Sequence, residues 1–524
     1  SNTYVGDNVS GLYAWGAQIV VGRSPGTYTR SRLANYLEYS EEFSNTTGWT
    51  QSGGAVQTNR FTYSEQFDNA AWTKTNSYVQ TNLLQYSEQF DIAGTWTASA
   101  AGTAVLANQT TAPDGTLTGD LVYPTSSAGR IYQAVTATLT QTFSVYAKAA
   151  GMRYLNFRVQ NNGAAAYVYF DLTGGVVSSG TGTIESVGNG WYRCSAPTNT
   201  SGTAVSFAPS DASGSTTSTP SGTNGVYVWG AQLVQGTVAG NYRATTSATL
   251  PISYTGPTGL LDAQKLLEDG TTNAHVVQQS VSITATNYAY SVYMKAFERT
   301  WGQIVNGTIA NCYAYFDLTN GVLGTVGAGA TAAIESIGSG WYRCTIFFTG
   351  TAASHALSVR TATGNGTGSY AGDGSSGIYI TKAQLVEGLV AAPYTPTTSA
   401  AVPIQYENFQ YANLAYKLVE NNATSTHAVY SANYATPITT PNTSITLSVY
   451  AKAAERGNVA LFTTNSNKGK FFNLSTGTVG GTLTTAPDSA SITPAGNGWY
   501  RCAITVSHNT LGSDGFQIFA ANGD

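Results

Sequence analysis

One segment that closes a repeat stands at the wrong end of this chain. Two repeats close with a Gly-Val/Ile-Tyr strand that runs into Ala-Gln-Leu-Val, at residues 225–236 and 377–388. The third repeat ends at Asp524 without such a segment, and the same pattern occupies residues 11–22. Joining residue 524 to residue 1 would restore the spacing seen in the second repeat to within a residue. The arrangement predicts a chain whose two ends complete one domain, either by joining copies end to end or as an excerpt of a longer array.

The repeated units have the length of whole domains. Three bodies share a Ser-Val-Tyr-x-Lys-Ala strand, a Phe-Asp/Asn-Leu strand and a Gly-Trp-Tyr-Arg-Cys strand, the last at residues 190–194, 340–344 and 498–502. Their spacing of about 150 residues far exceeds the roughly 20–50 residues of solenoid units. The sequence therefore predicts three domains in tandem.

A shorter motif recurs before the first body. Tyr-Ser-Glu-Glu/Gln-Phe followed by a Trp appears at residues 39–49, 63–72 and 86–96, and only the third copy leads into a body. Two interpretations stay open: a locally duplicated surface segment, or spare opening strands that pair with bodies elsewhere in the assembly. The predicted divisions are 1–35, closing strands of a preceding or neighbouring sandwich; 36–81, the duplicated openers; 82–245, 246–399 and 400–524, three domains of which the third lacks its own closing strand.

Composition and patterning favour an all-β fold. Charged residues are 10% of the chain, against roughly 25% in typical soluble domains, and there are 34 Tyr and 57 Gly. Phe143, Val145 and Ala147 alternate with polar residues, which indicates strands with one buried face. Short strands separated by turn signals predict two-sheet jelly-roll sandwiches strung into an elongated fibre, with almost no helix.

The same composition argues against several classes of function. A net charge of −4 without a basic cluster gives no footprint for nucleic acid. No run approaches the roughly 18 apolar residues that a membrane span needs, so no membrane insertion is expected. Cys194, Cys344 and Cys502 occupy equivalent places and are expected to be buried apolar residues, with Cys312 as an extra. No Cys/His spacing suits a metal, and neither metal nor cofactor is predicted.

A family resemblance follows from the order of these motifs. The Phe90…Trp96 opener, the Ile131-Tyr-Gln strand, the Phe143-Ser-Val-Tyr-Ala-Lys strand and the closing Val226-Tyr-Val-Trp-Gly-Ala-Gln-Leu strand resemble carbohydrate-binding jelly rolls of families 4 and 9. The variant here is similar to domains strung along bacteriophage virion fibres and tail-associated proteins. The resemblance implies a jelly-roll fold and a fibre setting, and says nothing of the ligand.

Comparison of the repeats gives no catalytic set. Glu185 and Glu335 correspond to Thr493, and Asp171 and Asp317 correspond to Asn473, so no carboxylate recurs in all three bodies. Glycoside hydrolysis would need a carboxylate pair across a cleft. We therefore predict that the chain is not an enzyme.

The candidate binding residues lie in the first body, opposite the apolar residues of their strands. Rings that lie against sugar C–H faces and forked donors for hydroxyls suit glycan binding. The competing interpretation is that this face packs against another domain or subunit. The predicted carbohydrate-binding residues are Tyr146, Lys148, Tyr154, Asn156, Arg158, Tyr167 and Tyr169.

The function expected from these features is a structural and adhesive fibre component on a phage head or tail, located on the virion surface or outside the cell. Expected partners are other copies of the chain and a cell-surface glycan. The alternatives are a bacterial extracellular filament or adhesin joined by strand donation, and the carbohydrate-binding region of a secreted glycan-degrading enzyme. The closing strand of the third domain can come from several sources. The near-seamless match of the two ends favours a neighbouring chain added head to tail, and the distance expected between the two ends of a row of three sandwiches disfavours the same chain.

Overall fold

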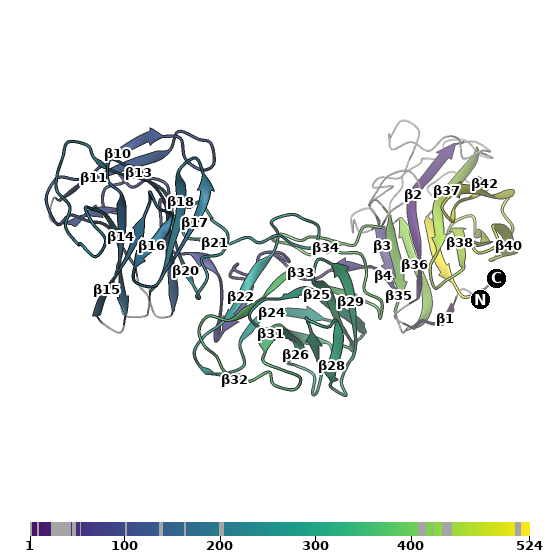
Figure 1. Ribbon diagram of the computed structural model, residues 1–524. Helices are drawn as coiled ribbons and strands as arrows, with labels where there is room; N and C mark the ends of the chain where they lie inside the picture. Colours follow the sequence, from purple (N-terminus) through teal and green to yellow (C-terminus); the bar gives the residue numbers. More distant parts are fainter. Residues whose placement is uncertain are drawn as a thin grey trace.

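The computed structural model describes residues 3–7, 10–21, 43, 49–52, 54–99, 102–135, 140–161, 164–198, 204–406, 415–421, 423–431, 443–508 and 515–523. The described residues form antiparallel sheets that pair into sandwich-like domains, and they include no α-helix. Three domains follow one another in a row, and both chain ends lie on the same outer domain (Figure 1). The expected all-β class and the near absence of helix are confirmed.

Domain 1 is built from the contiguous residues 82–245. One sheet has the order β10 (Thr103–Thr110), β11 (Gly119–Pro124), β20 (Gly225–Gln235), β13 (Gln141–Ala150), β18 (Trp191–Thr198) and β17 (Thr183–Gly188). The other has the order β16 (Val176–Ser179), β15 (Ala164–Asp171), β14 (Tyr154–Asn161), β19 (Ala204–Ser210), β12 (Ile131–Ala134) and β9 (Thr97–Ala98).

Domain 2 is built from residues 246–399 together with residues 60–79. Its first sheet has the order β29 (Thr331–Gly338), β30 (Trp341–Thr349), β25 (Asn287–Ala296), β33 (Gly377–Glu387), β22 (Gln264–Glu268) and β7 (Ser77–Val79). Its second has the order β28 (Val322–Val326), β27 (Tyr313–Asp317), β26 (Trp301–Asn306), β31 (Ala353–Ala362), β24 (Val276–Ile283) and β6 (Thr73–Thr75). A small pair, β23 (Thr272–Asn273) with β32 (Tyr370–Ala371), lies beside them.

Domain 3 is built from the described residues between 400 and 523 together with those between 3 and 56. Its first sheet has the order β4 (Gly54–Val56), β35 (Tyr416–Glu420), β2 (Gly11–Val21), β37 (Thr443–Ala453), β42 (Trp499–His508) and β41 (Ser489–Gly496). Its second has the order β1 (Thr3–Val5), β36 (Thr424–Ser431), β43 (Phe516–Ala521), β38 (Asn458–Thr463), β39 (Lys468–Asn473) and β40 (Thr478–Thr482), and β3 (Trp49–Ser52) also pairs with β36.

The displaced closing segment belongs to its own chain. Strand β2 pairs with β37 and β35 of the third body, in the place that β33 takes in domain 2. The expectation that a neighbouring chain supplies this strand is therefore wrong. It failed because the N-terminal segment runs back along the whole row, so the two ends of the chain meet: the Tyr4 hydroxyl donates to the Ala520 carbonyl at 3.3 Å (Figure 1).

The opening motifs are distributed over all three domains in reverse order. Phe43 and Trp49 of the first copy pack in the core of domain 3, and Phe67 and Trp72 of the second pack in the core of domain 2. Phe90 and Trp96 of the third copy pack in domain 1. Openers do pair with distant bodies, but within one chain. The rest of the first motif, with residues 22–42, lies outside the described residues.

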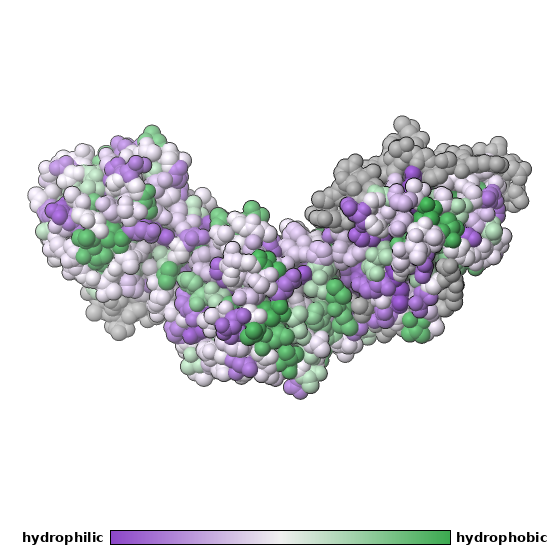
Figure 2. All heavy atoms as spheres, turned by 45° about the vertical axis from the view of Figure 1, so that its right-hand side comes forward, coloured by the Kyte–Doolittle hydropathy of each residue, from purple (hydrophilic) through white to green (hydrophobic). Residues whose placement is uncertain are grey.

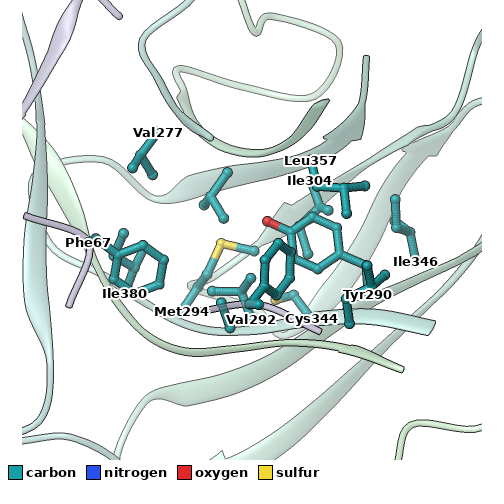
Figure 3. Packing of buried hydrophobic residues seen from close by; sticks show 14 of the residues in the cluster. Phe67, Val277, Tyr290, Val292, Met294, Ile304, Cys344, Ile346, Leu357 and Ile380 are labelled. Carbon is teal, nitrogen blue, oxygen red and sulfur yellow. The ribbon is translucent and has the colours of Figure 1, made fainter. Parts of the chain in front are cut away.

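Aromatic side chains of the openers fill the space between the two sheets. Phe61 and Phe67 both pack on Trp72, with ring centroids 5.1 and 4.7 Å apart. Figure 3 shows Phe67 in the same apolar cluster as Ile380 and Met294 of domain 2. Burial of such rings contributes about 2–3 kcal/mol each, so each domain depends on its opener for much of its core.

A buried ion pair holds the N-terminal residues Tyr4 and Asp7 to the C-terminal part of domain 3. Glu420 is almost fully buried and accepts two hydrogen bonds from Arg456 and one from Tyr4. Its Oε1 also accepts from the Asp7 backbone amide at 3.1 Å. Domain 2 repeats this arrangement with Glu268, Arg299, Tyr370 and Asp373. Removing one partner of such a pair leaves a buried charge and typically costs about 3–5 kcal/mol.

Each joint between domains is crossed twice by the chain. Strand β8 (Thr81–Asn82) pairs with β21 (Leu250–Pro251) between domains 1 and 2, and β5 (Thr58–Asn59) pairs with β34 (Val402–Pro403) between domains 2 and 3. We call these two-stranded connections the ties. In each, the same Val-Gln-Thr-Asn sequence passes from one domain to the next, at residues 79–82 and 56–59.

Side chains of the ties bind both flanking domains. Gln80 donates to the Gln235 carbonyl of domain 1 at 2.7 Å and accepts from Tyr254 of domain 2. Gln57 likewise donates to the Glu387 carbonyl at 2.7 Å and accepts from Tyr406. Each joint is therefore held by a strand pair and by a glutamine that bonds to both of its neighbours.

The surface is covered mainly by uncharged side chains. Figure 2 shows three lobes in a curved row. Their surface is largely in the pale colours of weakly polar residues, and apolar and strongly polar patches are scattered over it. All four cysteines are free and buried, so the expectation for Cys194, Cys344 and Cys502 is confirmed.

Candidate functional site

The predicted binding residues divide between two opposite faces of domain 1. Tyr146 and Lys148 lie on β13, in one sheet, while the other five lie on β14 and β15, in the other. All seven do point away from the core, as their alternation with apolar residues predicts. They do not form one continuous face, because the chain crosses from one sheet to the other between β13 and β14.

Tyr146 belongs to a structural cluster. Its ring centroid lies 5.2 Å from that of Trp229 and 5.6 Å from that of Tyr242, and the Arg193 guanidinium lies 5.5 Å above it. Arg193 also donates to the Gly240 carbonyl at 2.6 Å, which ties the segment after β20 onto the sheet. Burial raises the pKa of the Tyr146 hydroxyl.

The other two domains repeat this cluster. Arg343 lies over Tyr293 and Arg501 over Tyr450, at 5.6 and 5.4 Å. Trp341 and Trp499 are buried in the same clusters, as Trp191 is in domain 1. The Lys148 stem packs against the turn at Gly190, as Lys295 and Lys452 do at Gly340 and Gly498. Tyr146 and Lys148 therefore serve the scaffold.

The opposite sheet carries a polar and aromatic surface that we call the Arg130 face. It comprises Arg130, Asn156, Arg158, Tyr167 and Tyr169. On β14 and β15, Asn156 pairs with Tyr169 and Arg158 pairs with Tyr167, so the four side chains form a two-by-two block. The two tyrosine rings stack at 6.3 Å with 28° between their planes.

Arg130, the residue before β12, reaches this block from the neighbouring part of the sheet. Its Nη1 donates to Asn156 Oδ1 at 2.7 Å and its Nε donates to Ser206 Oγ at 3.1 Å. Its guanidinium carbon lies 5.5 Å from the centroid of Tyr167. A ring beneath a guanidinium and an amide beside it hold the group in one orientation.

The charged side chains of the Arg130 face are both positive. Burial, aided by the charge of Arg158, lowers the pKa of Arg130 to about 10. Within the described parts of the chain, neither Arg130 nor Arg158 forms an ion pair with a carboxylate, in contrast to Arg153, Arg299 and Arg456. Asn156 is fully buried, and its Nδ2 has no hydrogen-bond partner among the described residues.

Sequence comparison nominated Asn156, Arg158 and both tyrosines of this face but missed Arg130. Comparison of the repeats by sequence alone places His275 and His427 opposite Arg130. The strand register instead matches Arg130 to Val276 and Ala428. A shift of one residue moves a side chain to the other face of a sheet. His275 and His427 accordingly pack beside the rings of Tyr370 and Tyr4, in the structural arrangement around Glu268 and Glu420.

Tyr154 lies at the edge of the face, next to Arg153. The Arg153 guanidinium lies 5.3 Å from the Tyr154 ring and pairs with Asp171. Asp171 Oδ1 accepts from the Thr173 and Gly174 amides at 3.0 and 2.9 Å, and Asp317 and Asn473 cap the same turn in the other domains. An amide oxygen can fill this capping role, which explains the Asn in domain 3.

The face changes its chemistry along the row. Domain 2 keeps the amide and both tyrosines as Gln303, Tyr313 and Tyr315, with Val276 and Val305 in the places of the two arginines. In domain 3 the corresponding surface is apolar, and its buried members are Ala428, Ala460, Phe471, Phe519 and Ala521. The block with two guanidinium groups is thus specific to domain 1.

The described residues contain no cluster of His, Cys, Asp and Glu suited to a metal ion. Among them there is also no helix with the length and apolar character needed to cross a membrane. No model of a known protein family matches this chain, and no curated protein sequence shows significant similarity to it.

Proposed function

We propose that this chain is a structural and adhesive component of a fibre, carried on the surface of a phage particle, and that domain 1 binds a host-surface glycan. One observation carries the proposal. The domain that lies farthest from both chain ends carries the polar and aromatic face (Figure 1). A chain attached through domain 3 would present this face at its tip.

The architecture suits a rod. We infer that each sandwich is a jelly roll and that the ties give the row its stiffness, because two hydrogen-bonded strands bend less than one linker. Stacked tyrosines offer rings to the C–H faces of a sugar, and the arginine and asparagine side chains offer forked donors to its oxygens.

Assembly with further copies of the chain is part of the proposal. Leu260 and Leu261, at the end of a hairpin in domain 2, are each 65% exposed and suit a contact between copies. The alternative of a filament joined by strand donation loses its main support, because domain 3 takes its closing strand from its own chain.

The test is binding to host cells and to a glycan array. Replacing both Arg158 and Tyr167 with Ala should weaken binding at least tenfold, with little change in melting temperature, because Arg158 is exposed and Tyr167 is only half-buried on the outer side of its sheet. The matched control is Tyr313→Ala, at the equivalent place in domain 2. Unchanged binding by the Arg158/Tyr167 double variant would contradict the proposal.

A further inference from the structure

We infer that the ligand of the Arg130 face is an acidic glycan, bound through a sugar carboxylate. The inference rests on the proposed glycan-binding function and adds the chemical class of the ligand. It comes from the arrangement of donors and charges on this face rather than from its aromatic rings.

The first step concerns the positions of the two guanidinium groups. Arg158 lies opposite Ser206 in the β14–β19 pairing, and Arg130 donates to the hydroxyl and, at 3.4 Å, to the carbonyl of the same Ser206. Tyr167 lies opposite Arg158 on β15 and beneath Arg130. The two arginines thus flank the same serine and the same ring, and their positive charges converge on one place.

The second step concerns what offsets these charges. Elsewhere in the molecule, three partly buried arginines bind carboxylates: Arg60 binds Glu387, Arg299 binds Glu268 and Arg456 binds Glu420. Arg193 and Arg343, which lie over single tyrosine rings, instead donate to backbone carbonyls, but neither has a second arginine beside it as Arg130 has. On the Arg130 face, the described neighbours supply only a hydroxyl, a carbonyl and an amide oxygen. Two like charges in a partly desolvated place attract an anion from outside.

The third step concerns hydrogen-bonding capacity. Arg130 donates three of its five N–H groups to Ser206 and Asn156, which leaves two, and the guanidinium of Arg158 is exposed. The unpartnered Nδ2 of the fully buried Asn156 adds a third donor next to Arg130. A site with donors to spare fits a group that only accepts, and the planar fork of a guanidinium matches a carboxylate. The partly exposed ring of Tyr167, stacked on the buried ring of Tyr169, supplies the contact expected for a sugar.

The decisive variant is Asn156→Asp. It places a carboxylate where an oxygen already accepts from Arg130 at 2.7 Å, so the arginine gains an internal counter-ion. The fold should be retained, whereas an external carboxylate should be displaced. Arg130→Met removes the charge itself, and Arg360→Met, on the same face of domain 2, is the matched control.

The experiment measures binding of the full chain by calorimetry to three probes: an oligoglucuronic acid, its carboxyl-reduced counterpart, and a neutral glucan bearing sulfate groups. We expect the wild type to bind the first probe at least tenfold more tightly than the other two, and more weakly as salt rises. Asn156→Asp and Arg130→Met should each lose at least tenfold, and Arg360→Met should bind as the wild type does.

Three results would overturn the inference. Equal binding of the carboxyl-reduced probe, lost in Tyr167→Ala but kept in Asn156→Asp, would make the ligand a neutral glycan and leave the proposed function standing. Preferred binding of the sulfated probe would show that the face recognises an anion other than a carboxylate. No binding of any probe, with host-cell binding unaffected by changes on this face, would overturn the inference and the proposed function together.

Discussion

Asp120 shows how a single position differs between domains that share a fold. It is buried on β11, and its two oxygens accept from the Phe90 and Asn108 amides at 3.0 and 2.9 Å. In domain 2 the equivalent Gln264 accepts from the Phe67 and Asp68 amides without carrying a charge. Burial raises the pKa of Asp120 from 3.8 to about 6, despite both hydrogen bonds. At this position domain 1 therefore has a buried carboxylate, whereas domain 2 has a neutral amide.

This pKa predicts an unusual pH dependence for domain 1. A raised pKa means that the folded state binds the proton more tightly than the unfolded state, so this contribution to stability is present below about pH 4 and is lost as pH rises through 6. The unfolding free energy of domain 1 should fall by roughly 2 kcal/mol between pH 4 and pH 7. Hydrogen exchange of the β11 amides, corrected for intrinsic rates, measures this change.

Two comparisons identify the group responsible. Asp120→Asn should remove most of the fall in the unfolding free energy of domain 1 between pH 4 and pH 7. The loss of one hydrogen-bond acceptor should also lower this free energy at every pH. Asp171 acts in the opposite sense: hydrogen bonds from Arg153 hold its pKa at about 2, so its contribution is lost only as pH falls from about 4 to 2. An equal fall in unfolding free energy in Asp120→Asn and in the wild type would show that another group titrates in this range.

At the scale of elements, the ties are what distinguish this molecule from domains joined by single linkers. Asn82 illustrates their construction: its Nδ2 donates to the Arg243 carbonyl at 2.8 Å, and its Oδ1 accepts from the Leu84 and Leu233 amides. Asn59 makes the corresponding bonds to Thr395, Phe61 and Leu385. The entering strand, the closing strand and the exit segment of a domain are thereby fixed to one side chain.

Loss of the bridging glutamines should loosen the joints without unfolding the domains. Replacing both Gln57 and Gln80 with Ala removes side-chain hydrogen bonds between neighbouring domains, each worth about 1 kcal/mol. We expect a broader distribution of inter-domain angles in electron micrographs and small-angle scattering, and melting temperatures within a few degrees of the wild type. Gln109→Ala is the control, because this exposed side chain bonds only to Ala107 of its own strand. An unchanged angular distribution would show that the backbone pairing alone sets the stiffness.

The sequence predicts elements better than it predicts their partners. Alternation in β13 and β14, the Gly-Trp-Tyr-Arg-Cys strands and the buried cysteines were predictable because they depend on neighbours in sequence. Whether β13 and β14 share a sheet depends on where the chain crosses, which alternation does not encode, and so Tyr146 was grouped with Tyr167. Arg130 was missed because aligning it with His275 carries an error of one residue, which inverts the face.

At the scale of the whole molecule, domain 3 is made of two parts separated by about 340 residues of chain. Its core combines Leu12, Ile19 and Trp49 with residues from 416 onwards. The number of openers equals the number of bodies, and this was the signal in the sequence. Its meaning was obscured because three sandwiches in a row were expected to keep the two ends apart, whereas the ties bring the chain back.

Closure within one chain predicts the behaviour of a split protein. Residues 58–524 alone should keep domains 1 and 2 folded and leave domain 3 open, because β2 and the first opener are missing. Adding residues 1–57, joined to a solubility tag, should restore slow hydrogen exchange in β37 and β43, and the same fragment with Leu12→Asp should not. In the intact chain, this protection should not change on dilution from micromolar to nanomolar, whereas closure by a neighbouring chain would be lost.

The reversed order of the openers also has a consequence for biosynthesis. As the chain leaves the ribosome, residues 1–81 emerge before the bodies of domains 2 and 3, and their aromatic strands have nothing to pair with until those bodies follow. Of the three domains, only domain 1 has all its strands in one stretch, so domain 1 completes first, then domain 2, and then domain 3 on strands made before either. Contacts this distant in sequence form slowly, and the waiting segment carries exposed Trp and Phe side chains in the meantime. Translation that stops after domain 1 and before strand β43 therefore leaves domain 1 closed and domain 3 open.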